Sequence, residues 1–328
     1  MIRATVRLSL AVIALAAVSC RAQTPSQCDT NIPPITAGYG ADGPYKADME
    51  SVDNPGFARK PVEIFFPLRA SGKRPVVFFS HGYGPGAWET NEGLIDHAVS
   101  RGYIVVFSSY PMIGVTMDAR YDALWQGFQA AVDKFGDRMD LTRVAFVGHS
   151  FGGGANPSMA YDGIVKKGWG SNGAFLFELA PWYVYQMPND KLAALPKSLA
   201  HAVEVYDKDN KNDHRMAIDL YANTPVDQRY YFLVHSETVA GCDITADHAV
   251  PGRNPSERQR EYALYRPFDA LAADAFDKST EAKAALSTMG ASTSVSPYQP
   301  LELVAHPSPV QPESYYDNAW SSSRNSRK

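Results

Sequence analysis

The chain has 328 residues, of which 45% are hydrophobic, 20% charged and 12% aromatic. This composition is typical of a globular protein and excludes a collagen, a coiled coil and a wholly disordered chain. The 31 Lys and Arg residues against 35 Asp and Glu residues give a formal net charge of −4. Because the basic residues form no long run, no nucleic-acid partner is expected.

Residues 1–22 have the features of a secretory signal peptide. Arg3 and Arg7 precede the apolar stretch 8–18, and small residues follow up to Ala22. The apolar stretch is shorter than the roughly 20 residues that span a bilayer, and no later segment is long and apolar enough to do so. We therefore expect an exported protein, secreted or periplasmic, with no transmembrane segment.

The three cysteines have different expected fates. The segment Ala17-Val18-Ser19-Cys20 loosely resembles a lipoprotein signal, with Ala in place of the usual Leu, so a lipid anchor at Cys20 is an alternative to cleavage near residue 22. Cys28 and Cys242 remain in either case. Two cysteines in an exported protein favour a disulfide, with two free thiols as the alternative. The bridge would tie the N-terminal arm to the loop 236–250.

Short apolar strands alternate with amphipathic helices from residue 57 to about residue 289. We expect strands at Val62–Phe66, Pro75–Ser80, Tyr103–Ser108, Arg143–Val147, Ala174–Leu179, Ala202–Tyr206 and Arg229–Val234. We expect helices at Glu89–Arg101, Asp118–Phe135 and Phe151–Lys167, and from Pro255 to about Leu286. Strands that are apolar on both faces predict an α/β domain, a mostly parallel, twisted sheet with helices on both faces.

The segments that flank this domain, residues 57–289, differ from it in composition. Residues 23–56 form the preceding arm, whose first part is rich in Pro and Gly and predicts an irregular course over the domain. Residues 290–328 are rich in Pro and Ser and predict a mobile tail.

The most specific motif is Gly148-His149-Ser150-Phe151-Gly152, which directly follows the expected strand Arg143–Val147. A tight turn from strand to helix holds the serine in a strained conformation and exposes its hydroxyl above the sheet. Gly148 and Gly152 lack the Cβ atoms that would clash there. The pattern predicts that Ser150 is a nucleophile. The alternative is a Gly-Ser turn with no chemistry.

A second glycine-rich segment, Ser80-His81-Gly82-Tyr83-Gly84, follows the strand that ends at Ser80. In this architecture one oxyanion-hole N–H comes from such a loop and the other from the residue after the nucleophile. We assign these donors to the backbones of Tyr83 and Phe151, and expect the Tyr83 ring to contact the substrate. His81 is interpreted as a residue that stabilises the turn rather than as a base.

These motifs, SHGYG, GHSFGG and Ala180-Pro181-Trp182, resemble those of the α/β-hydrolase superfamily over about residues 75–286. Within it they are similar to the cutinase-like polyester hydrolases, chlorophyllases and platelet-activating-factor acetylhydrolases. Many polyester hydrolases have Met after the nucleophile, where this chain has Phe151. The resemblance implies an α/β-hydrolase fold and places Trp182 as a substrate-stacking wall of the acyl site. A tryptophan packed in the core is the alternative.

The acid of the expected triad lies between the serine and the histidine along the chain. The run 207–213, after the strand Ala202–Tyr206, offers Asp207, Asp209 and Asp213. The family pattern favours Asp209, and the other two remain alternatives. The run also resembles a calcium loop, but Lys and Asn occupy its fifth and sixth positions, where an oxygen ligand and Gly are needed. No metal is therefore expected.

Three histidines are candidates for the base. His235 is at a strand end, His214 follows the acidic run, and His248 lies in a loop before the last long helix. A loop delivers a side chain over the sheet edge more readily than a strand end does, which favours His248. The loop is longer than in usual family members and contains Cys242, so the predicted disulfide would pin it.

Together these residues predict an exported serine hydrolase of carboxylic esters. It would act through a Ser-His-Asp triad and an acyl-enzyme, with no cofactor, on small-molecule or polymeric esters. Two alternatives stay open, because a fold does not fix a function. One is a catalytically silent binding protein, and the other is a non-hydrolytic enzyme, such as a lyase or perhydrolase, on the same fold.

Overall fold

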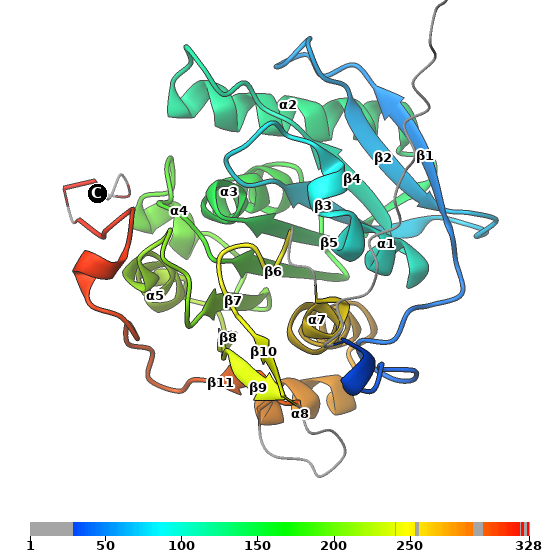
Figure 1. Ribbon diagram of the computed structural model, residues 1–328. Coiled ribbons are helices and arrows are strands. Elements are labelled where there is room, and N and C mark those ends of the chain that lie inside the picture. Colours follow the sequence, from blue (N-terminus) through cyan, green and yellow to red (C-terminus); the bar gives the residue numbers. More distant parts are fainter. Residues whose placement is uncertain are drawn as a thin grey trace, which may run out of the picture.

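The protein is an α/β structure built on one large sheet (Figure 1). The computed structural model describes residues 29–239, 241–252, 256–290, 298–321, 323–324 and 327. The nine-stranded sheet has the order β1-β2-β4-β3-β5-β6-β7-β8-β11. Its strands are β1 (Ala47–Val52), β2 (Val62–Pro67), β3 (Arg74–Ser80), β4 (Ile104–Ser108), β5 (Met139–His149), β6 (Gly173–Leu179), β7 (Ala200–Tyr206), β8 (Gln228–Val234) and β11 (Leu301–Leu303). Strands β3 to β8 are parallel to one another, whereas β1, β2 and β11 pair antiparallel. The predicted α/β class with a mostly parallel sheet is confirmed.

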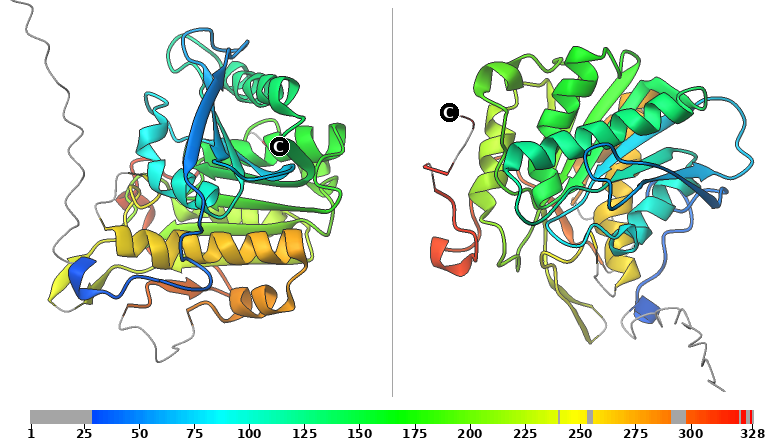
Figure 2. Two further views of the ribbon diagram at one scale, coloured as in Figure 1. Left: turned by 90° about the vertical axis from the view of Figure 1, so that its right-hand side faces the viewer. Right: turned by 90° about the horizontal axis from the view of Figure 1, so that it is seen from above.

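Helices cover both faces of the sheet (Figure 2). One face carries α1 (Glu92–Ser100), α7 (Arg266–Asp277) and α8 (Thr280–Thr288); the other carries α2 (Met117–Phe135), α3 (Phe151–Ala160), α4 (Asn189–Ala193) and α5 (His214–Asn223). In β3, Val77 and Phe79 pack into the first layer, while Val76 and Phe78 pack into the second. This burial on both sides explains why the central strands are apolar without alternation.

The segment predicted as one helix, Pro255–Leu286, is interrupted. It comprises α6 (Glu257–Arg260), a π-helical turn (Glu261–Tyr265), α7 and α8. Lys278 has a left-handed backbone, with φ of 57°, which ends α7. The Ser279 side chain then accepts a hydrogen bond from the Ala282 amide and caps α8. Short elements elsewhere are β9 (Glu237–Val239), β10 (Cys242–Ile244), the π-helical turn Tyr161–Lys166, and the 3₁₀ turns Asp29–Asn31, Trp88–Thr90 and Glu313–Tyr315.

Polar contacts attach the N-terminal arm to the helices below the sheet. The Gly40 amide donates to Asp269 Oδ2 at 2.8 Å, and Asp42 Oδ1 lies 2.8 Å from His97 Nδ1. His97 Nε2 meets Asp269 Oδ1 at 3.1 Å. Although burial disfavours the charged ring, the bonds to Asp269 and Asp42 raise the pKa of His97. The arm is therefore held by charge-assisted bonds, and its residues 47–52 add β1 to the sheet.

The end of the chain also joins the domain, where the sequence predicts a mobile tail. β11 pairs with β8 at the edge of the sheet. Residues 311–321, which we call the C-terminal strap, continue beside α5, drawn in red in Figure 1. The strap reaches residues 207–213, here called the acid loop. The backbone N–H of Asn318 donates to the Lys211 backbone carbonyl at 2.9 Å. The backbone N–H of Asp213 donates to the Asn318 backbone carbonyl at 3.1 Å. The domain thus extends beyond the predicted range 57–289 at both ends.

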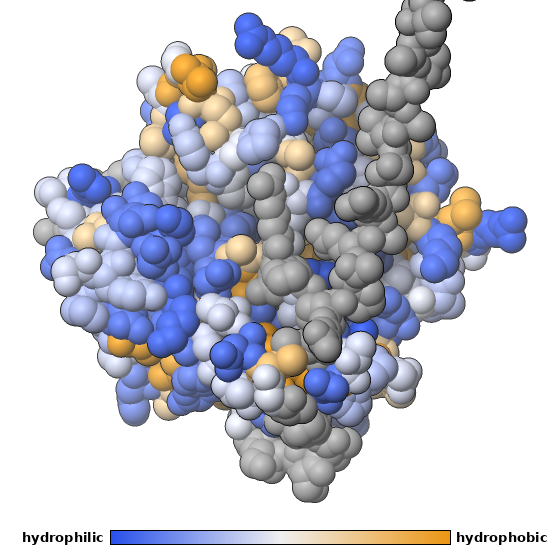
Figure 3. Space-filling view, viewed as in Figure 1, coloured by the Kyte–Doolittle hydropathy of each residue, from blue (hydrophilic) through white to orange (hydrophobic). Residues whose placement is uncertain are grey.

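Several predictions on export fall outside the described residues. Residues 1–22, Cys20 and Cys28 are not among them, so the signal peptide, the lipid anchor and the Cys28–Cys242 disulfide stay predictions. Within the part of the chain that is described, no helix has the length and hydrophobicity needed to cross a membrane. On the face shown in Figure 3, hydrophobic side chains form small, separate spots among hydrophilic ones.

The aromatic anchor of the strap gives a test of its attachment. The Trp320 ring stacks on Tyr183 with centroids 5.5 Å apart, and its amide donates to Asp213 Oδ2 at 2.9 Å. We expect Trp320→Ala to lower the free energy of unfolding by at least about 0.5–1.5 kcal/mol, measured by urea denaturation. Trp320→Phe keeps the stacking and should lose less. Equal stability of Trp320→Ala and wild type would contradict the described packing.

Candidate active site

Ser150 lies in a strained turn between β5 and α3. Its φ of 55° and ψ of −116° are uncommon for a residue with a side chain. The Ser150 amide donates to the Leu179 carbonyl at 2.8 Å, and the Trp182 amide donates to the Ser150 carbonyl at 2.8 Å. Both contacts come from the end of β6 and the loop that follows it, so the neighbouring strand fixes the turn. The serine also precedes the N-terminus of α3, whose dipole favours negative charge nearby.

The loop after β3, residues 81–87, passes directly over this turn. A Cβ atom on Gly82 would lie 3.3 Å from Ser150 Cβ. The Tyr110 hydroxyl donates to the Gly82 carbonyl at 2.9 Å, and the Tyr110 ring stacks on His81 at 4.3 Å. The loop therefore presents the backbone on either side of Gly82 next to the serine. Tyr83 follows there, and as a residue it is 62% exposed.

His81 supports this loop rather than acting as a base. Its Nδ1 lies 2.7 Å from the Gly82 carbonyl. Burial lowers the pKa of His81 to about 4, against the effect of that bond. The ring is therefore neutral near pH 7, and Nδ1–H donates to the carbonyl.

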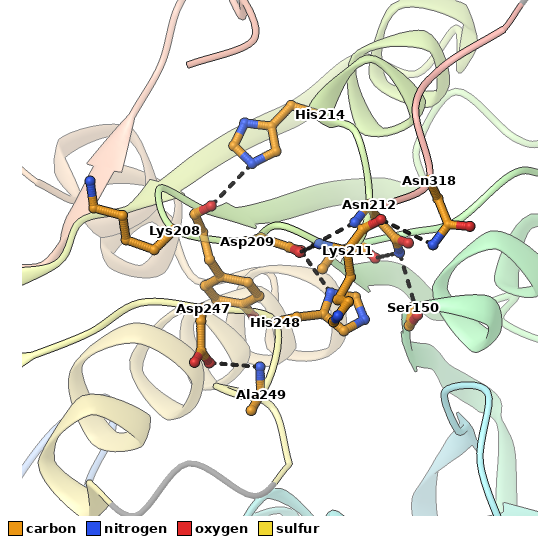
Figure 4. A network of polar contacts seen from close by, with 12 residues as sticks. Ser150, Lys208, Asp209, Lys211, Asn212, His214, Asp247, His248, Ala249 and Asn318 are labelled. Carbon is orange, nitrogen blue, oxygen red and sulfur yellow. Dashed lines mark hydrogen bonds and ion pairs between the residues drawn. The ribbon is translucent and has the colours of Figure 1, made fainter. Parts of the chain in front are cut away.

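Asp209 and His248 form a bonded pair beside the turn (Figure 4). Asp209 Oδ2 lies 2.7 Å from His248 Nδ1. Asp209 Oδ1 accepts hydrogen bonds from the backbone N–H groups of Lys211 at 2.7 Å and Asn212 at 3.3 Å. The carboxylate is 1% exposed, while the imidazole is 21% exposed and lines the same cavity as Ser150. The carboxylate thus fixes the ring through Nδ1 and leaves Nε2 for the cavity side.

The alternative acids and bases are engaged elsewhere. Asp207 accepts a hydrogen bond from Ser236, and Asp213 caps α5 by accepting from the Arg215 amide. His235 meets Glu302 of β11 at 2.6 Å, at the sheet edge. His214 lies against the Tyr206 carbonyl. Among the six candidates for the acid and the base, all of them described residues, only Asp209 and His248 are bonded to each other.

A second buried imidazole lies against His248. The His149 ring centroid is 4.7 Å from that of His248. Burial lowers the pKa of His149 well below its usual value, and the neighbouring His248 lowers it further. Because His149 stays neutral, a protonated His248 meets no like charge from this side.

Asn212 is the residue that contacts the Ser150 hydroxyl. Its Nδ2 donates to Ser150 Oγ at 3.3 Å and to the Ala180 carbonyl at 2.9 Å. Since the hydroxyl accepts this bond, its own proton remains available to a base. Asn212 belongs to the acid loop, so the same seven residues carry the carboxylate and the amide that meets the serine.

Two cavities meet at Ser150 and Tyr83. The first, of about 250 Å³, is bounded by the glycine-rich loop 81–87, by Asn91 and by the two histidines, His149 and His248. The second has about 370 Å³ and is lined by Tyr83, Met117, Arg120, Ser150, Phe151, Trp182, Asn212 and Asn318. A substrate with two parts joined at a reactive bond fits this arrangement, one part on either side of the serine.

Trp182 is positioned at the second cavity, as the resemblance implies. It also contacts the core, because its ring lies 6.0 Å from Phe151 and 5.8 Å from Tyr183. The Phe151 side chain is buried and packs against Tyr110 and Tyr121, while its backbone begins α3. Trp182 therefore both lines this cavity and packs against the core, while its contact with a substrate stays a prediction.

Known protein families and curated proteins offer no match to this chain. The chain matches no model of a known protein family, and no curated protein matches it significantly. The chemistry of the site is therefore inferred from its own residues.

Three residues of the site have no counterpart in the sequence-based predictions: Arg120, Asn212 and Asn318. Asn212 is three positions after Asp209 and directly precedes Asp213, the N-cap of α5. Recognition of this cap in the sequence would have placed Asn212 in the loop that carries Asp209. Arg120 lies in the first turn of the amphipathic helix α2. A long charged side chain at such a position normally reaches solvent. No local signal marks Asn318, since its role depends on contacts with residues about a hundred positions earlier.

The close packing at Gly152 gives a test of the turn. A Cβ there would lie 1.9 Å from the Ser80 carbonyl oxygen, which cannot move independently of β3. We expect Gly152→Ala to lower the free energy of unfolding by about 1–3 kcal/mol or more, measured by urea denaturation. Gly84→Ala is the control, because a Cβ at Gly84 meets nothing within 4 Å. Equal stability of the two variants would argue against this turn.

Proposed function

We propose that the protein is an exported serine hydrolase of carboxylic esters. Ser150 is the nucleophile, His248 the general base and acid, and Asp209 the carboxylate that orients the base. The observation that carries the proposal is the 2.7 Å contact between His248 Nδ1 and a buried Asp209, beside the strained Ser150. Nothing in ordinary packing requires a serine with positive φ next to such a pair, whereas acyl transfer uses all three groups.

Each residue has a defined step in the reaction. Ser150 Oγ attacks the ester carbonyl while its proton passes to His248 Nε2. The backbone N–H groups of Tyr83 and Phe151 donate to the developing oxyanion, each worth about 3 kcal/mol of the barrier. His248 then gives the proton to the leaving alcohol, which produces an acyl-enzyme. Water, deprotonated by the same imidazole, releases the acid and restores Ser150.

We infer that the chain has the α/β-hydrolase fold. Three features support this: the serine follows β5 in a tight strand-to-helix turn, the loop after β3 lies over it, and the acid and base follow in the order Ser, Asp, His. All three groups lie at the carboxyl ends of parallel strands, where open α/β sheets bind ligands. Export is proposed from the signal-like residues 1–22.

The nucleophile is tested with a fluorophosphonate probe, which bonds only to an activated serine. We expect wild type to form one adduct and Ser150→Ala to form none, measured by intact mass spectrometry. Hydrolysis of a simple aryl ester, with analysis of its products, then separates a hydrolase from a lyase or perhydrolase. Absence of the adduct in folded wild type would identify a silent binding protein and overturn the proposal.

The acid is tested by Asp209→Asn. The amide removes the charge that stabilises the imidazolium and disturbs the tautomer of His248, so we expect kcat to fall by about 10⁴-fold. Asp207→Asn is the matched control: it lies in the same loop, bonds Ser236 and should retain most of the activity. Equal losses in the two variants would refute the assignment.

A further inference from the structure

Arg120 places a buried positive charge at the second cavity. The side chain belongs to α2, is 7% exposed as a residue, and lines the cavity together with Ser150, Phe151 and Trp182. Its guanidinium lies between two rings, 5.4 Å from the centroid of Tyr83 and 5.8 Å from that of Phe151. Both rings belong to residues whose backbones flank the serine.

The contacts of this guanidinium leave its charge unpaired. Nε donates to the Pro111 carbonyl at 3.3 Å, Nη2 to the Met112 carbonyl at 2.7 Å, and Nη1 to the Met117 sulfur at 3.3 Å. Among the described residues, no Asp or Glu forms an ion pair with Arg120. The other buried arginine, Arg327, is paired with Asp219.

A buried cation without an anion is costly, because carbonyls, a sulfur and aromatic faces compensate it only in part. Guanidinium has five N–H donors, so the three contacts leave one N–H on each terminal nitrogen. Two such donors on one planar group match the two oxygens of a carboxylate.

The rest of the cavity restricts what can carry that carboxylate. Met117 and Trp182 contribute apolar side chains to the same lining as Arg120 and Ser150, while Asn212 and Asn318 are uncharged. An apolar linker ending in one negative charge is therefore complementary to the cavity, and no acidic side chain lines it to repel the charge.

We propose that Arg120 binds a carboxylate on the substrate, so that the preferred esters are monoanionic, such as half-esters of dicarboxylic acids. The inference rests on the proposed function, since it assumes that esters are hydrolysed at Ser150. A purely structural Arg120, which only fastens residues 111–117 to α2, is the competing interpretation. It would leave the choice between anionic and neutral esters unaffected.

The experiment compares matched esters on the full-length protein. One pair places the charge on the acyl part: mono-4-nitrophenyl glutarate against 4-nitrophenyl pentanoate. The other places it on the alcohol part: 4-acetoxybenzoate against phenyl acetate. We expect wild type to favour the anionic member of at least one pair. In Arg120→Gln the ratio of the two kcat/KM values for that pair should fall by about 10- to 100-fold, the range for a hydrogen bond to a charged group.

Arg229→Gln is the control variant. Arg229 also lies over a tyrosine ring, 5.0 Å from the centroid of Tyr221, and its loss removes the same charge away from the site. It should leave the ratio unchanged. If Arg120→Gln fails to fold, competitive inhibition of wild type by glutarate, compared with the uncharged glutaramide, replaces it, and stronger inhibition by glutarate is expected.

The outcomes separate the two proposals. Hydrolysis of neutral esters with no anionic preference in either pair, or a preference that survives Arg120→Gln, overturns the role of Arg120 and leaves the hydrolase intact. If no ester of either pair is hydrolysed and the fluorophosphonate forms no adduct, the proposed function itself fails. Inhibition cannot be measured in that case. Calorimetry then tests Arg120 directly: glutarate should bind to wild type more tightly than to Arg120→Gln, and equal binding overturns the role of Arg120.

Discussion

The left-handed backbone of Ser150 is the constraint on which the site depends. Such a conformation costs about 1–3 kcal/mol for a residue with a side chain and persists only where its surroundings enforce it. Here the Leu179 carbonyl and the Trp182 amide hold the turn from β6, while Gly152 fits against β3. The strain is thus offset by three parallel strands in register. The glycine-rich loop 81–87, the acid loop and the second cavity all lie against this turn.

Few charged side chains lie near the Ser150 turn, and they belong to two different places: Asp209 is bonded to His248 of the first cavity, and Arg120 lines the second. Burial lowers the pKa of His81 to about 4 and that of His149 well below its usual value, so the two rings nearest His248 and the glycine-rich loop are neutral near pH 7. The negative charge of Asp209 is taken up by that ring and two backbone amides. Arg120 lies on the opposite side, among aromatic and sulfur atoms. His248 thus lines the first cavity and Arg120 the second, while Ser150 belongs to the lining of both.

The sequence predicts the central strands, the turn and the acid and base candidates because their signals are local. Apolar runs predict β3 to β8, and glycines predict the turn. In the structure, Asp209 Oδ2 and His248 Nδ1 lie 2.7 Å apart. It does not predict β11 or the C-terminal strap, since proline-rich composition suggests mobility while the strap is held by backbone pairing with a distant loop. The position of Arg120 at the second cavity is not predicted either, because only tertiary packing decides whether an arginine on a helix faces water or a cavity.

The C-terminal strap has a consequence for the order in which the protein is made. Ribosomes release a chain from its N-terminus, so Ser150, Asp209 and His248 all emerge before Asn318 and Trp320. The acid loop then lacks the backbone partners that Asn318 supplies and the stacked Trp320 that closes over Tyr183. In a chain that ends before the strap, the Asp209 carboxylate keeps its bonds to the backbone amides of Lys211 and Asn212, but the loop that carries it lacks its contacts with the strap. The acid loop therefore reaches its described set of contacts only after residues 318–320 have been added to the chain.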